Sequence, residues 1–163
     1  GTIHWRGAGI SDDVIGALWA EGVIAEIILF AFSGAVVARL NPIRLMWIAA
    51  IAGIVRWAIL AGTTDVTVLF ATQWLHGLTF GAAHLAAMHY MLRTVPEHMS
   101  ASAQSLYSGF AIGLVMGLMM LVTGWLYDVY GGSAFYAMIV LSAAGGVIAI
   151  WLSRMGGERA SAG

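Results

Sequence analysis

Three ionisable side chains stand in the middle of long apolar stretches of the chain. Arg56 lies 14 residues into an apolar run of 21, Ile43 to Thr63, and His76 lies 11 residues into the next run. Glu26 occupies the middle of the run before them. An ionisable side chain in hydrocarbon costs roughly 2.5–3.5 kcal/mol on insertion scales, so it normally marks a polar pathway inside a helix bundle. The pattern predicts a device that moves a solute, together with protons, across a membrane.

The depth of each group follows from the rise of about 1.5 Å per residue in an α-helix. Glu26 is roughly 18 Å and His76 about 15 Å from the outer ends of their helices by this rise. Arg56 is about 20 Å from the inner end of its helix, or about 10 Å from the outside of a 30 Å core. The three groups therefore share one layer, in which an acid, a fixed cation and an imidazole can pair.

Their chemistry indicates distinct functions for the three groups. Arg56 keeps its proton, so it could bind a carboxylate or lower the proton affinity of a nearby acid. Glu26 and His76 both gain and lose protons, so either could couple transport to a proton gradient. The alternative is a structural ion pair that holds the helices in register. In the third apolar run, Gln73, His76 and Phe80 share one helix face, with His84 at its edge; these residues complete the candidate solute and proton site.

The composition places the chain among membrane proteins. It is 61% hydrophobic and 9% charged, with a mean hydropathy of +0.89, whereas soluble domains usually carry about 25% charged residues. The net charge of −1 argues against a nucleic-acid partner. The absence of cysteine excludes disulfides, thiolate metal sites and cysteine nucleophiles. No metal or other cofactor is expected, apart from protons as the coupling ion.

Five stretches are long enough to cross about 30 Å of hydrocarbon as helices, which takes about 20 residues. They are 14–38, 43–63, 66–92, 103–126 and 134–152. Short polar connections such as Asn41-Pro42 and Gly131-Gly132 separate them and predict antiparallel neighbours. The predicted fold is an all-α membrane protein with an external segment 1–12, a membrane part 13–154 and a cytoplasmic tail 155–163.

The arginines predict the orientation in the membrane. Five fall on one side of the predicted helices: Arg39, Arg44, Arg93, Arg154 and Arg159. Arg6 alone falls on the other side. By the positive-inside rule the first residue is outside and the last is cytoplasmic. An external start before an odd number of spans predicts at least one further helix before Gly1.

The residues resemble the C-terminal half of a major facilitator superfamily transporter. The turn Gly34-Ala-Val-Val-Ala-Arg39-Leu-Asn-Pro-Ile-Arg44 is similar to that superfamily's Gly-rich, Arg-containing loop, and the stretch from Arg93 to Tyr107 fits the next cytoplasmic connection. More narrowly, the segments Trp19–Phe30 and Leu75–His84 resemble the 3-phenylpropionic acid transporter branch, which is related to oligosaccharide and nucleoside proton symporters.

The resemblance implies that the five spans are helices 8–12 of a twelve-helix fold, with residues 1–12 holding the end of helix 7. It also implies a bacterial inner-membrane location, an N-terminal half as partner, and a small organic solute such as an aromatic acid, a sugar or a nucleoside. Arg56 precedes His76 by 20 residues, as the corresponding pair does in lactose permease. The acid that follows that histidine by three residues is replaced here by Thr79, so Glu26 would have to supply it.

Two other classes of function remain open. A truncated or accessory membrane protein without transport activity would fit the five-span count. A membrane metalloenzyme is suggested by the spacing of His84 and His89, which matches one histidine box of the desaturases. Such a site needs several boxes, and the chain has five histidines, with His4 and His98 outside the spans. The chain is therefore expected not to be an enzyme.

Overall fold

The apolar runs of the sequence become five long helical rods in the computed structural model, which describes residues 1–161 and the side chains of residues 1–154. The first rod is α2 (Asp12–Ala31) with α3 (Ser33–Arg39), and the second is α4 (Pro42–Gly62). The short helix α1 (Thr2–Gly7) precedes them. No strand occurs among the described residues. The predicted all-α fold class is confirmed.

The third and fourth rods each contain a π-helical insertion. The third consists of α5 (Val66–His76), the π-helix η1 (Gly77–Gly81) and α6 (Ala82–Thr94). After the short η2 (Glu97–Met99), the fourth consists of α7 (Ser100–Tyr107), the π-helix η3 (Ser108–Val115) and α8 (Met116–Tyr130). Single π turns within α-helices are frequent at functional sites. The sequence pattern predicts neither insertion.

The helices begin and end at the expected local signals. The Asn41 side chain accepts a hydrogen bond from the Arg44 backbone N–H, with Pro42 in the first turn of α4, and Asp65 caps α5 through the Val68 N–H. Gly131, with φ +56°, ends α8 at the turn η4 (Gly131–Ala134). The last rod, α9 (Phe135–Ser161), continues as helix into the predicted tail, whose residues 162–163 lie outside the described part. The division at residues 12 and 154 stays a prediction.

Apolar length marks several rods as membrane-spanning. Three stretches of the described chain are long and apolar enough to cross a membrane: Asp12–Ala31, Pro42–Gly62 and Glu97–Arg154, which contains the last two rods. The rod from Val66 to Thr94 is not among them. It carries Gln73 and three histidines, and it packs against both α2 and α4, so its polar positions lie beside protein.

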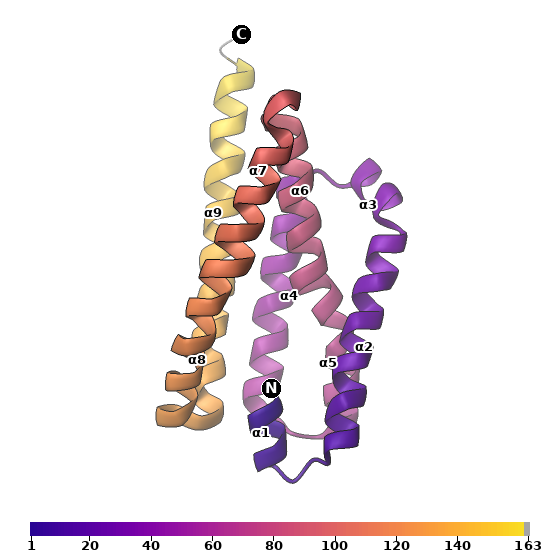
Figure 1. The fold of residues 1–163 in the computed structure, drawn as a ribbon, viewed down its shortest axis with the longest axis vertical. Coiled ribbons are helices and arrows are strands. Elements are labelled where there is room, and N and C mark those ends of the chain that lie inside the picture. The colour runs from indigo at the N-terminus through magenta and orange to yellow at the C-terminus, as the bar shows by residue number, and fades with distance from the viewer. Residues whose placement is uncertain (162–163) are drawn as a thin grey trace.

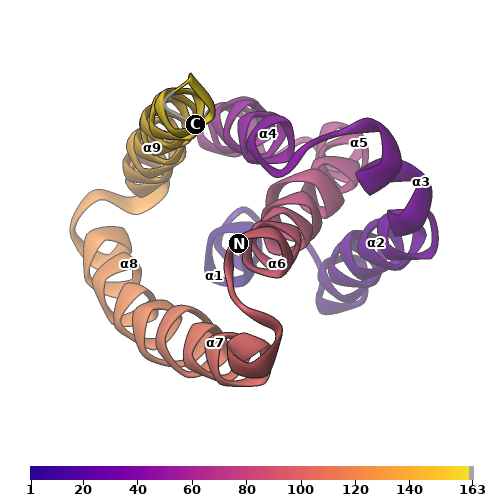
Figure 2. The ribbon, with the colours of Figure 1, turned by 90° about the horizontal axis from the view of Figure 1, so that it is seen from above.

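Four of the rods pack against one another, and the fifth makes few contacts with them. In Figure 2, α4 lies between α9 and the α5–α6 rod, and α2 lies on the far side of that rod. The α7–η3–α8 rod curves away from this group, and none of its residues is buried. Its apolar surface must therefore be covered by lipid or by further protein.

Two hydrophobic clusters lie at opposite ends of the packed group. One contains Trp5, Ile15, Leu18, Leu60, Leu69 and Phe135. The other contains Leu45, Ala49, Ala82 and Ala86, near the ends where α3, α6 and α9 finish. The polar side chains singled out in the sequence lie at the levels between these clusters.

Candidate functional site

Two of the three predicted mid-membrane groups meet directly. Glu26 of α2 and His76 at the end of α5 approach to 2.8 Å between Oε1 and Nε2. Their side chains are 17% and 20% exposed, so the contact is shielded from most of its surroundings without being sealed. An acid and an imidazole at this distance can share a proton, and the charged pair is tolerated in hydrocarbon because each group compensates the other.

Glycines on the facing helices allow this approach. A Cβ on Gly77 would lie 2.9 Å from the Ala25 carbonyl oxygen, and a Cβ on Gly22 would lie 3.1 Å from His76 Cδ2. On the next turn, a Cβ on Gly81 would lie 2.8 Å from a methyl group of Leu29. Side chains at these positions would push α2 and the α5–η1 rod apart. The glycines therefore set the distance between Glu26 and His76.

The π-helix η1 arranges the rings on the third rod. Residues four apart on an α-helix are offset by about 40° around the axis, because a turn takes 3.6 residues. The wider π turn reduces this drift for residues spaced by four. The rings of His76 and Phe80 are nearly parallel, with 13° between planes, and those of Phe80 and His84 differ by 6°. The rings repeat at 6.1 Å and 6.4 Å and form a ladder along the rod.

Arg56 is the third predicted group, and it lies at the edge of the Glu26–His76 pair. Its side chain is 5% exposed and its Cζ lies 5.0 Å from the centre of the Trp57 ring, a cation–π distance. Its Nε has no hydrogen-bond partner among the described residues, and no ion pair joins it to Glu26 there. Arg56 thus provides a buried positive charge that is not neutralised by direct contact with the acid.

A cavity of about 370 Å³ adjoins this charge. It lies between α4, the third rod and α9, and its polar lining comes from Arg56, His76, Thr79 and Ser142. Phe80 and Trp57 supply aromatic walls. Ser142 was not singled out from the sequence, although it is the first serine after Ser133 in a mostly apolar stretch. The cavity could hold a small solute with an anionic or hydrogen-bonding group toward the guanidinium.

Gln73 is fully buried, and both polar atoms of its amide lack hydrogen-bond partners among the described residues. Its Oε1 lies 3.4 Å from where a Cβ on Gly22 would be, one helical turn before His76. Buried amides are normally hydrogen-bonded, so this side chain offers both a donor and an acceptor at the level of His76. Its assignment to the site stays a prediction.

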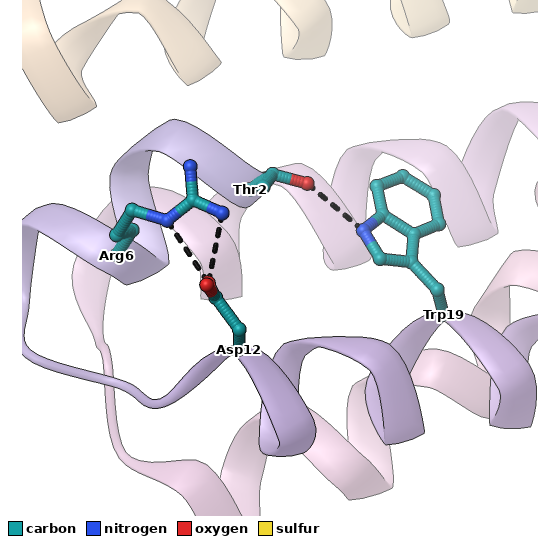
Figure 3. Close-up of polar contacts among 4 residues, drawn as sticks. All are labelled: Thr2, Arg6, Asp12 and Trp19. Atoms are coloured by element: carbon teal, nitrogen blue, oxygen red, sulfur yellow. Dashed lines mark hydrogen bonds and ion pairs between the residues drawn. The ribbon is translucent and has the colours of Figure 1, made fainter.

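Polar contacts join the helix α1 to α2 (Figure 3). Arg6 donates two hydrogen bonds to Asp12 Oδ1, at 2.9 and 2.8 Å, and Trp19 Nε1 donates to the Thr2 hydroxyl at 3.0 Å. The Arg6–Asp12 pair is exposed and adds little stability. The Trp19 ring, however, lies 6.4 Å edge-on from the His76 ring. Trp19 thereby connects α1 to the Glu26–His76 pair.

The remaining predicted residues lie elsewhere. His84 lines a second cavity together with Phe80. The loop residues Gly34, Arg39, Arg44 and Arg93 are exposed, and α3 and α6 end at the same end of the bundle (Figure 1), so they do not contribute to the site between the helices. His84 and His89 share no cluster of three metal-binding side chains within the described residues, which leaves the metalloenzyme alternative without a ligand set there.

Comparison with known proteins relates the chain to membrane transporters. The MFS_1 like family matches residues 2–138. The chain is 36% identical over 141 residues to the probable 3-phenylpropionic acid transporter of Escherichia coli (strain K12), covering 86% of this chain and 37% of that protein. It is 25% identical to the uncharacterized transporter YwbF of Bacillus subtilis (strain 168), over 90% of this chain and 37% of that protein.

A third relative is the maltose permease of Geobacillus stearothermophilus, at 26% identity over 92% of this chain and 38% of that protein. The chain thus spans well under half the length of these curated relatives. All three are named as transporters or permeases rather than enzymes. No solved structure matches the chain significantly.

Proposed function

Because the chain belongs to the MFS_1 like family and is a multi-pass membrane protein, we propose that it forms the C-terminal half of a proton-coupled secondary transporter. The solute is a small organic molecule such as an aromatic acid, a sugar or a nucleoside. The transporter lies in a bacterial inner membrane, with Gly1 outside and the C-terminus cytoplasmic. The observation that carries the proposal is the 2.8 Å contact between Glu26 and His76, which is held in a membrane bundle beside the buried Arg56.

The proton site is the Glu26–His76 pair. A proton that enters from one side binds to either group and is released on the other side after the bundle has reopened. Arg56 keeps its charge throughout, so it attracts an anionic group of the solute. No other cofactor takes part.

A transport cavity needs a second wall, facing the bundle described here. Major facilitator halves face each other across a cavity at the middle of the membrane and rock about the bound solute. The bundle described here supplies one wall, with its polar side chains between two hydrophobic clusters. The N-terminal half of the same protein is the partner that supplies the other wall.

The test uses the full-length protein in proteoliposomes with an imposed pH gradient. Glu26→Gln keeps the size and polarity of the side chain but removes its charge. We expect the variant to lose accumulation of solute and the accompanying proton uptake, while exchange of labelled for unlabelled solute continues. Glu97→Gln, at the exposed turn η2, is the matched control and should behave as wild type. Unchanged proton flux in Glu26→Gln would show that Glu26 is structural and would overturn this assignment.

A further inference from the structure

A second cavity lies one to two helical turns from the Glu26–His76 pair. Its volume is about 460 Å³, and it is an open cavity lined by residues of α2, α3, the third rod and η3. The residues that line it include Phe30, Ser33, Phe80, His84, Met88 and Ile112. It is displaced from the pair toward the end of the bundle where α3 and α6 finish, which carries the exposed arginines (Figure 1). Volumes of this size are common for small-molecule sites.

Three aromatic rings surround His84, and two of them, Phe30 and Phe80, line the cavity. The Phe80 ring is nearly parallel to His84, at 6.4 Å and 6°. The Phe30 ring meets His84 edge-on at 6.1 Å and 80°, and the Tyr107 ring is tilted by 47° at 5.9 Å. The three rings come from α2, η1 and α7, so three separate elements turn an aromatic side chain toward one histidine. Edge-to-face and offset-parallel contacts are the arrangements that aromatic rings prefer.

Phe80 separates this cavity from the one beside Arg56. It lines both cavities, and its side chain is 37% exposed. Phe80 belongs to the π-helix η1. Its ring lies between the cavity beside Arg56 and the cavity beside His84. Both cavities have aromatic rings on their walls, but only the first is lined by a buried cation, Arg56.

His84 contributes a polar group to an otherwise apolar wall. Its Nδ1 is enclosed and has no hydrogen-bond partner among the described residues, which leaves Nε2 as the nitrogen that can face the cavity. The Ser33 side chain is the other polar group on the lining. A ligand here would present a flat apolar body to the rings and at most a few hydrogen-bonding atoms to its edge.

We propose that this cavity binds the planar aromatic ring of the transported solute. It is a second binding site, separated by the Phe80 side chain from the cavity beside Arg56. This inference rests on the proposed transport function and narrows its solute to molecules that carry a planar ring. It makes Phe80 and His84 residues that determine specificity. A saturated ring, which is puckered and has no π face, fits such a site less well.

The test measures binding to the purified full-length protein with two matched probes, 3-phenylpropionate and 3-cyclohexylpropionate, and with uridine as a second planar ring. Phe80→Leu and His84→Leu should each raise the dissociation constant for the planar probes about tenfold, and that of the saturated probe less than about twofold, because only ring–ring contacts are lost. His84→Phe keeps the ring and should retain most of the affinity for 3-phenylpropionate. Phe110→Leu, a ring on η3 that is 60% exposed and does not line the cavity, is the control.

Three results would overturn the proposal. The first is a wild-type protein that binds neither 3-phenylpropionate nor uridine. The second is an equal loss of affinity for the planar and saturated probes in Phe80→Leu and His84→Leu, or no loss at all. The third is a co-purified lipid whose occupancy, measured by native mass spectrometry, falls in these variants. Proton coupling is tested separately by Glu26→Gln. If proton coupling fails but the variants still lose affinity for planar probes more than for the saturated probe, the proposed ring-binding site is supported.

Discussion

Glu26 and His76 lie 2.8 Å apart because Gly22 and Gly77 remove the side chains that would otherwise stand between α2 and the third rod. The acid comes from one helix and the imidazole from another, and the backbones must approach closely before the two can touch. The distance is therefore a property of the packing as much as of the two charged residues. Several expectations follow from this relationship.

Replacing His76 should separate proton movement from solute binding. In His76→Gln the imidazole is lost but a hydrogen-bonding side chain remains beside Glu26. We expect uphill uptake to fall by at least about tenfold, since such intramembrane ionisable groups are normally functional, whereas solute exchange persists. The measurement is pH-driven uptake against equilibrium exchange in proteoliposomes. Equal losses in both assays would instead indicate general damage to the fold.

Replacing Arg56 should reveal whether its charge or its shape matters. Arg56→Ala leaves the 370 Å³ cavity without its cation, so we expect uptake to fall by at least about tenfold. Arg56→Lys restores a charge without the planar guanidinium that lies against Trp57, and we expect it to recover part of the activity. Uptake assays on membranes with matched protein levels provide the test. Wild-type uptake by Arg56→Ala would contradict the assignment.

Filling the close contact at Gly77 should damage the site through packing. A Cβ there would meet the Ala25 carbonyl oxygen at 2.9 Å, so Gly77→Ala must move backbone. Overpacking of this kind typically costs about 1–3 kcal/mol. We expect a lower melting temperature of the detergent-purified protein and weaker uptake. Gly117→Ala, where no atom of the described chain lies within 4 Å of the added carbon, should change neither. Equal behaviour of the two variants would argue against the close approach.

Gln73 should matter for transport more than for folding. Its amide is fully buried with no protein hydrogen bond in the described part of the chain, so Gln73→Met removes a desolvated polar group at similar volume. We expect stability to stay the same or rise by about 1 kcal/mol, while uptake falls. Thermal unfolding and uptake are measured on the same preparation. A strong loss of stability with normal uptake would make Gln73 a structural residue.

The helices and the layer of polar groups could be predicted from the sequence, because both depend on local patterns. Apolar runs of about 20 residues give membrane helices, and counting residues along them gives depth. Glu26 and His76 were placed at one level in this way. Their contact follows from the rotation of two helices about their axes, which depends on packing by Gly22, Gly77 and Gly81.

The features that could not be predicted from the sequence depend on tertiary structure. The π-helices at Gly77 and Ser108 arise from one extra residue per turn, and no residue type marks that choice. The sequence allows Arg56 to pair within the layer but does not indicate its position against Trp57, the next residue along its own helix. Tyr107 and Phe30 meet at His84 because three rods converge there, which apolar periodicity alone does not reveal.

The two hydrophobic clusters differ in the size of their side chains, and this difference affects how each end of the bundle can move. The cluster around Trp5 and Phe135 is built from large side chains that interlock, so helices there can turn only as a block. In the other cluster, three of the four buried residues are alanines, Ala49, Ala82 and Ala86, beside Leu45, and small side chains at a helix contact allow packed helices to slide by small steps. The arginine-bearing end should therefore shear, and the opposite end should act as its pivot.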